Sequence, residues 1–238
     1  MASHTRIPVS VDRAAKPVWQ DGFAWCVGFV LLVLSIGFSY SIPAVAQNLE
    51  STPRNAFRAT SRLPREIRRV AVLPIAVEQP DQTMDFAQES LQPVLLAELN
   101  KRGLFELVVV TPEQLTQWTG KSHWSTVEKL PALLLERLHD DLGCDAVLFT
   151  RLSQYKPYPP LAMGWNLHLV LTDHPRVCWA ADEVFDMSTR DVAASAQRYG
   201  RQQFEGPDLH LNPNSISLSP RQFGQYSLAA LLATLPSR

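Results

Sequence analysis

The 238-residue sequence lacks the short motifs that mark many enzymes and nucleotide-binding proteins. It contains no G-x-S-x-G elbow, no Walker or G-x-G-x-x-G loop, no C-x-x-C pair and no H-E-x-x-H helix. Catalytic groups would have to come from scattered positions, so the sequence predicts no catalytic residue, no metal ligand and no cofactor. We therefore expect a protein that is not an enzyme and has no evident small-molecule substrate.

An excess of charge of one sign is also lacking, since 22 Lys and Arg residues oppose 23 Asp and Glu residues. Residues 1–46 hold three of the basic and two of the acidic residues, which leaves 19 and 21 in the remainder. Domains that bind nucleic acids are usually clearly basic. The sequence therefore predicts no nucleic-acid partner.

Cysteine is scarce, with three residues in the chain. Cys26 stands at the start of an apolar run, whereas the cysteine of a lipoprotein signal follows the run, so a lipid anchor is not indicated. Cys144 and Cys178 could form a disulfide if the domain is exported. Both lie near the starts of predicted strands that are about two strands apart, which could exceed the spacing that a disulfide tolerates. Two buried thiols are the alternative.

The most informative stretch present is the apolar segment that begins at Phe23 and ends in Ala44-Val45-Ala46. A basic region, an apolar run and an A-x-A site form the pattern of a secretory signal peptide, which predicts residues 1–46 as the signal and cleavage between Ala46 and Gln47. Residues 23–45 are also long enough to be an uncleaved transmembrane helix.

Six arginines follow the apolar segment. They are Arg54, Arg58, Arg62, Arg65, Arg68 and Arg69. Positive charge on that side disfavours an anchor whose carboxyl side is exported. We expect residues 47–68 to be an arginine-rich linker, either solvated or in contact with anionic lipid headgroups or other envelope polyanions. The charge pattern favours a cleaved signal peptide, or an anchor with the main domain in the cytoplasm.

Residues 69–238 are expected to form a single α/β (α+β) domain, because short apolar runs alternate with helical patterns. The predicted strands are 70–75, 105–110, 145–155, 161–172 and 177–186, and the predicted helices are 85–102, two helices between 111 and 142, 188–204, and one beginning at 219–220. The order β-α-β-α-α-β-β-β-α-α predicts a mixed five-stranded sheet with helices packed on it. Short connections predict that the last three strands form an antiparallel meander.

The strand 161–172 alternates apolar and polar residues, which places Asn166 and His168 on a face turned to water or to a partner. We predict a partner-binding face at these two residues. Other ionisable residues are interpreted as solvated: the cluster His139-Asp140-Asp141 at a helix end, and Asp182, Glu183 and Asp186 along the last strand.

Part of the sequence resembles a known family. Two stretches are similar to patterns of bacterial envelope proteins. The first is Leu142-Gly143 followed by Asp145-Ala146-Val147-Leu148, and the second is Val177-Cys178-Trp179-Ala180 with Phe185-Asp186. That family contains the curli-secretion lipoprotein CsgG and the amino-terminal domain of TolB, and penicillin-binding-protein activator lipoproteins share its architecture. The resemblance covers about residues 68–200 and implies a non-enzymatic envelope component that acts by binding or assembly.

Three functions remain open from the sequence. The first is an exported, periplasmic-side adaptor or assembly factor that binds another envelope protein. The second is an envelope hydrolase with dispersed catalytic residues, which would need a deep polar cleft. The third is a cytoplasmic domain tethered by an uncleaved anchor.

Overall fold

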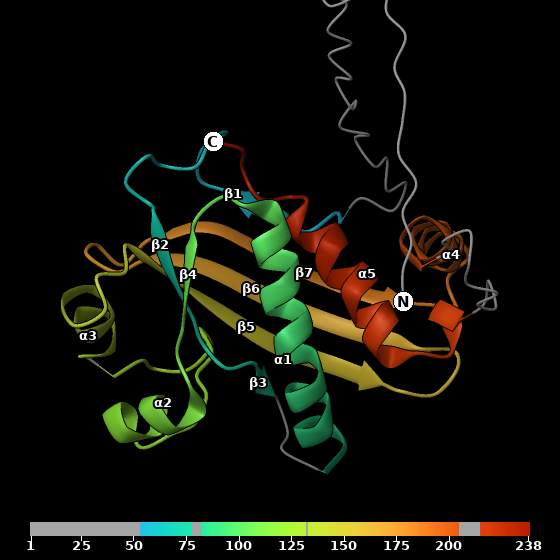
Figure 1. Ribbon diagram of the computed structural model, residues 1–238, viewed down its shortest axis with the longest axis horizontal. Helices are drawn as coiled ribbons and strands as arrows, with labels where there is room; N and C mark the ends of the chain where they lie inside the picture. Colours follow the sequence, from blue (N-terminus) through green and yellow to red (C-terminus); the bar gives the residue numbers. More distant parts are fainter. Residues whose placement is uncertain (1–52, 78–81, 132, 205–214) are drawn as a thin grey trace, which may run out of the picture. The chain divides into compact units, whose positions relative to one another are not determined.

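The computed structural model describes residues 53–77, 82–131, 133–204 and 215–238. Within them, one sheet of seven strands carries helices on both faces (Figure 1). The strands are β1 (Ala56–Arg58), β2 (Arg69–Val72), β3 (Ala76–Val77), β4 (Glu106–Val109), β5 (Ala146–Lys156), β6 (Ala162–Leu171) and β7 (Val177–Asp186). The helices are α1 (Gln82–Arg102), α2 (Pro112–Thr119), α3 (Leu134–Asp140), α4 (Arg190–Phe204) and α5 (Pro220–Leu232), with a 3₁₀ turn η1 (Ser215–Ser217).

The sheet is mixed, as the sequence predicted. Its order is β1-β7-β6-β5-β2-β4, with β3 paired to β5 beyond the end of β2. Strands β4, β2 and β5 are parallel, whereas β5, β6 and β7 form the expected antiparallel meander. The predicted fold class and the order of these five strands along the chain are therefore confirmed.

Two short strands were not predicted. Pro74 cannot donate a ladder hydrogen bond, and β2 ends at Val72, before the predicted end at residue 75. Strand β3 follows beyond the predicted strand and pairs with β5. Strand β1 arises in the segment that was expected to be a linker, and it pairs with β7. In residues 53–68, Leu63 and Ile67 are buried, and Leu63 N–H donates to the Ser237 carbonyl, so this part belongs to the domain.

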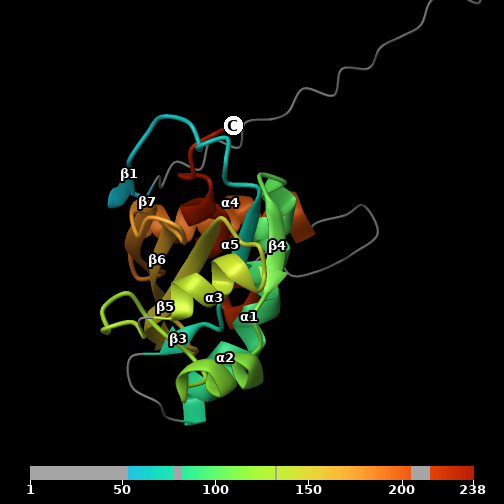
Figure 2. The ribbon, with the colours of Figure 1, turned by 90° about the vertical axis from the view of Figure 1, so that its left-hand side faces the viewer.

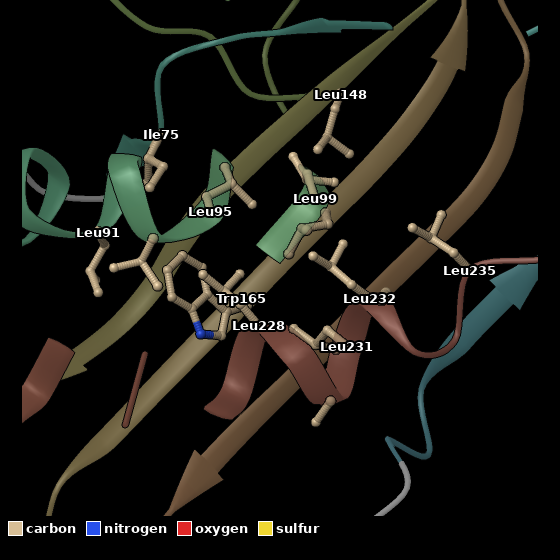
Figure 3. Packing of buried hydrophobic residues seen from close by; sticks show 14 of the residues in the cluster. Ile75, Leu91, Leu95, Leu99, Leu148, Trp165, Leu228, Leu231, Leu232 and Leu235 are labelled. Carbon is tan, nitrogen blue, oxygen red and sulfur yellow. The ribbon is translucent and has the colours of Figure 1, made fainter. Parts of the chain in front are cut away.

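The larger hydrophobic cluster lies between the sheet and helices α1, α4 and α5. Figure 3 shows leucines of α1 and α5 packed over Trp165 of β6. Two buried indoles bind α5 and the turn after it: Trp165 Nε1 donates to Ser227 Oγ at 2.8 Å, and Trp179 Nε1 donates to Thr234 Oγ1 at 3.0 Å. These bonds satisfy the two indole N–H groups, which burial of the rings would otherwise leave without an acceptor.

The opposite face of the sheet is covered over only part of its width. Helices α2 and α3 and the segment around Trp124 bury a smaller cluster that includes Val147 and Phe149 of β5. No described helix covers this face of β6 and β7, as Figures 1 and 2 show together. Part of the meander is consequently open to solvent or to a partner.

The sequence contains two capping-box patterns, Thr111-Pro112-Glu113-Gln114 and Ser125-Thr126-Val127-Glu128, and each predicts the start of a helix. Thr111 caps α2 as expected, because Thr111 Oγ1 accepts from Gln114 N–H and Gln114 Oε1 accepts from Thr111 N–H. The capping box predicted at Ser125 forms no helix in the structure. Glu128 instead pairs with Lys121 Nζ at 2.6 Å, and the helical segment α3 begins only at Leu134.

Candidate functional site

The candidate site is the uncovered face of the meander, which we call the open face. Strand alternation and register place on it the residues Phe57, Arg151, Asn166, His168, Ala180, Asp182 and Val184. The leucines of β6 point the other way into the larger cluster, as the sequence pattern predicted. Both residues of the predicted partner face, Asn166 and His168, therefore belong to the open face.

A polar row crosses the open face at the level of Asn166. Arg151 of β5, Asn166 of β6 and Asp182 of β7 are cross-strand neighbours. Asn166 Nδ2 donates to Asp182 Oδ2 at 3.0 Å. The Asn166 side chain is only 8% exposed, and its Oδ1 has no hydrogen-bond partner in the described residues. A buried acceptor without a donor costs free energy.

His168 lies one row away and links the sheet to the loop that precedes α3. Its Nδ1 is 2.9 Å from Thr126 Oγ1, a contact between residues 42 positions apart. Burial lowers the pKa of His168 below its ordinary value of 6.5; Asp182 opposes that shift and Arg151 reinforces it. The imidazole is thus kept neutral at neutral pH, which suits a hydrogen-bonding residue of an interface.

Exposed apolar side chains flank these polar groups. Phe57 on β1 is 55% exposed, Val184 on β7 is 47% exposed, and Val127 beside Thr126 is 68% exposed. Phe57 is the cross-strand neighbour of Ala180, which in turn neighbours His168. Exposed apolar side chains gathered on one face of a sheet are typical of an interaction surface.

Asp182 was interpreted from the sequence as a solvated edge charge, and the structure gives it a partner in Asn166. Thr126 and Arg151 were not identified from the sequence. Arg151 follows the four apolar residues 146–149 of β5, and the sequence alone does not say which face of the sheet it occupies. The register of β5 against β6 places it beside Asn166. Thr126 reaches His168 through a loop, for which the sequence offers no signal.

A second concentration of ionisable groups lines a hollow of about 500 Å³ at the start of β5. It includes Glu66, His139, Asp145, Asp173, His174 and Arg176. Asp145 Oδ2 accepts from the N–H groups of Arg68 and Arg69 at 2.8 and 2.9 Å, and the His174 side chain is 91% exposed. Local structural bonds and exposure account for these groups, so the hollow is not the deep polar cleft that a hydrolase would need.

No group of three or more His, Cys, Asp or Glu residues in the described ranges is arranged to hold a metal ion. His139, part of the cluster seen in the sequence, has its Nδ1 3.3 Å from the carbonyl of Cys144 and 3.3 Å from Thr172 Oγ1. Its neighbours Asp140 and Asp141 are exposed at the end of α3, as the sequence suggested.

Cys144 and Cys178 are both buried free thiols. Cys144 belongs to the smaller cluster and Cys178 to the larger one, so they lie on opposite faces of the sheet. The disulfide that the sequence left open is not present in the structure. Burial raises the pKa of both thiols, which makes each a poor nucleophile.

The arginines predicted to contact polyanions are mostly exposed, and two of them have structural partners. Arg58 Nε donates to the Thr234 carbonyl, and Arg69 Nη1 donates to the Leu142 carbonyl at 2.8 Å. Contact with anionic lipids stays a prediction. The predicted cleavage site, Ala46 and Gln47, and the segment 23–45 lie outside the described residues, and none of the described helices is long and apolar enough to span a membrane.

No protein-family model and no curated protein matches the sequence. Among solved structures, the PelC dodecamer from Paraburkholderia phytofirmans is 14% identical, with a TM-score of 0.43 over 77% of this chain and 96% of that one. Lipoprotein GNA1162 from Neisseria meningitidis is 17% identical, with a TM-score of 0.39 over 57% and 94%. The LpoB C-terminal domain from Salmonella enterica is 18% identical, with a TM-score of 0.31 over 50% and 82%. These likenesses assign neither a family nor a function to this chain, and its resemblance to CsgG and TolB stays a prediction.

Proposed function

We propose that this chain is a non-enzymatic component of the cell envelope that binds another envelope protein through the open face and acts as an adaptor or assembly factor. The observation that carries the proposal is the open face itself, where Phe57, Val127 and Val184 expose apolar side chains around the polar row. Apolar area gathered on one exposed face is typical of a surface that binds another protein.

The composition of the open face supports a protein partner. Asp182 of the polar row is exposed and can accept hydrogen bonds that orient a partner. An extracytoplasmic location rests on the sequence pattern of residues 1–46. The mass of the mature amino terminus tests that location, because a first residue of Gln47 requires cleavage by an export pathway.

Site-specific photo-cross-linking tests the adaptor function. A photoreactive residue is placed at Val184 or Phe57 on the open face, or at the exposed control positions Glu136 on α3 and Arg201 on α4. In native cells we expect one discrete cross-linked product from both open-face positions and none from the controls. The product should weaken when Asn166→Lys places a charge in the polar row.

Two outcomes would contradict the proposal. One is an identical set of products from open-face and control positions, which would indicate contact without a defined surface. The other is the absence of any product from the open face in a chain whose circular dichroism shows that it is folded.

A further inference from the structure

A second interaction surface lies at the far edge of the sheet, on strand β4. β4 is the last strand of the sheet, and no described strand pairs with its outer side. Glu106 N–H donates to the Arg68 carbonyl at 2.8 Å and Val110 N–H to the Val72 carbonyl at 3.1 Å, so these amides face β2. Backbone groups alternate in direction along a strand, which turns those of Leu107 and Val109 outward. The edge therefore offers donors and acceptors to an added strand.

A groove runs beside this edge, between α1 and the end of β4. Its volume is about 530 Å³, and its apolar walls are formed by Pro74, Pro93, Leu96, Val109 and Pro112. Val109 is 47% exposed, whereas Leu107 and Val108 before it are half-buried. Side chains of an added strand that point toward α1 would enter this groove and cover Val109.

The rim of the groove is acidic. Asp85 and Glu89 stand on the exposed side of α1 and line the groove together with the amides of Gln88 and Gln92. Neither carboxylate has a basic side chain within ion-pair distance in the part of the chain that the structure describes. The basic residues of α1, Lys101 and Arg102, lie in its last turn, away from Asp85 in the first turn. The groove thus combines apolar walls with negative charge along its rim.

We propose that this groove binds an extended segment of a partner protein by strand addition to β4. The segment carries apolar residues that fill the groove and lysine or arginine residues that pair with Asp85 and Glu89. A second copy of the chain fits less well, because antiparallel pairing of two β4 strands brings Glu106 of the copy toward the acidic rim. The arginine-rich segment of this chain is itself packed into the domain through β1, Leu63 and Ile67.

The surface is separate from the open face, since β4 and β7 lie toward opposite edges of the sheet. An adaptor that holds two partners needs two such surfaces, but strand addition at β4 does not depend on the function proposed for the open face. Photo-cross-linking from Val184 and peptide binding at β4 can therefore succeed or fail independently.

The probe is a capped, fluorescently labelled octapeptide, called the valine–lysine peptide, in which two valines and two lysines stand at alternate positions with threonine between them. In an added strand all four side chains therefore face α1. The peptide is titrated against the full chain in non-ionic detergent. We expect saturable binding that weakens about tenfold in the double variant Asp85→Lys with Glu89→Lys, because two attractive contacts become repulsive. The matched control, Glu136→Lys with Asp140→Lys, makes the same change in net charge on exposed positions of α3 and should bind as the unmodified chain does.

Two further peptides separate strand addition from simple charge attraction. A valine–glutamate octapeptide should not bind, and a valine–lysine peptide methylated on alternate backbone amides should bind at least tenfold more weakly, because it cannot donate to the free edge of β4. The proposal is overturned if the valine–lysine peptide does not bind, if the α1 and α3 double variants bind it equally, or if backbone methylation has no effect.

Discussion

Asp145 offers the sharpest test of how this fold is held together. Its carboxylate stands at the start of β5 and accepts two backbone N–H groups of the neighbouring chain segment, from Arg68 at 2.8 Å and Arg69 at 2.9 Å. One residue thereby fixes the start of β5 beside the start of β2. The conservative change Asp145→Asn keeps an acceptor oxygen, and Asp145→Ala removes it.

The expected loss follows from the exposure of the two bonds. The bond to Arg69 N–H is partly buried, and leaving that donor unsatisfied costs about 1–3 kcal/mol. The bond to Arg68 N–H is exposed, so water replaces most of it at a cost of roughly 0.5 kcal/mol. We expect Asp145→Ala to lower the free energy of unfolding by about 2 kcal/mol, and Asp145→Asn to lower it by about 1 kcal/mol or less.

Asp141→Ala is the matched control, because Asp141 is an exposed aspartate at the end of α3. A carboxylate is unfavourable at the carboxyl end of a helix, so its removal should leave stability unchanged or raise it by about 0.3 kcal/mol. Urea denaturation of residues 47–238, followed by tryptophan fluorescence, measures all three variants. If Asp145→Ala and Asp141→Ala agree within about 0.5 kcal/mol, Asp145 does not join the strands, and its carboxylate is free for another role in the hollow it lines.

Three other predictions concern the sheet and its buried groups. A Cβ on Gly164 would lie 2.5 Å from Ser153 Oγ, so Gly164→Ala should cost about 1–3 kcal/mol in a melt, and Ser153→Ala should recover part of that loss. The pKa of His168 is lowered in the fold, so the unfolded chain takes up a proton at a higher pH than the folded chain does, and stability falls as the pH drops below about 6.5. The variant His168→Gln should flatten this loss of stability between about pH 7.5 and about pH 5.5 in urea titrations. Iodoacetamide should label Cys144 and Cys178 only after unfolding, and rapid labelling of either native thiol would contradict their burial.

Interactions between near neighbours in the chain could be predicted from the sequence. The cap of α2 needs Thr111 and Gln114, three positions apart, and both of its hydrogen bonds are found. The same reasoning failed at Ser125, whose side chain is 3% exposed and packs where the chain covers the sheet. There the long-range contact of Thr126 with His168 and the pairing of Glu128 with Lys121 outweigh the local preference for a helix.

The fold class could be predicted because alternation and apolar runs are strong in β5, β6 and β7. Four successive apolar residues predict a strand that is buried on both faces. In β5, Ala146 and Leu148 indeed enter the larger cluster while Val147 and Phe149 enter the smaller one. Strands β1 and β3 have three and two residues, too few for a period of two to be recognised. They exist because tertiary pairing with β7 and β5 supplies their hydrogen bonds.

The open face marks the limit of prediction from sequence. Alternation in β6 placed Asn166 and His168 on one side of the sheet, but the chemistry of that side depends on register, which brings Arg151 and Asp182 beside Asn166 from strands on either side. A slip of one residue in either pairing would turn these charged groups to the apolar face. The large side chains of the opposite face favour this register, because a slip would turn Trp165 and Trp179 out of the larger cluster and break their bonds to Ser227 and Thr234. Burial on one face of the sheet thus helps to determine which polar groups meet on the other.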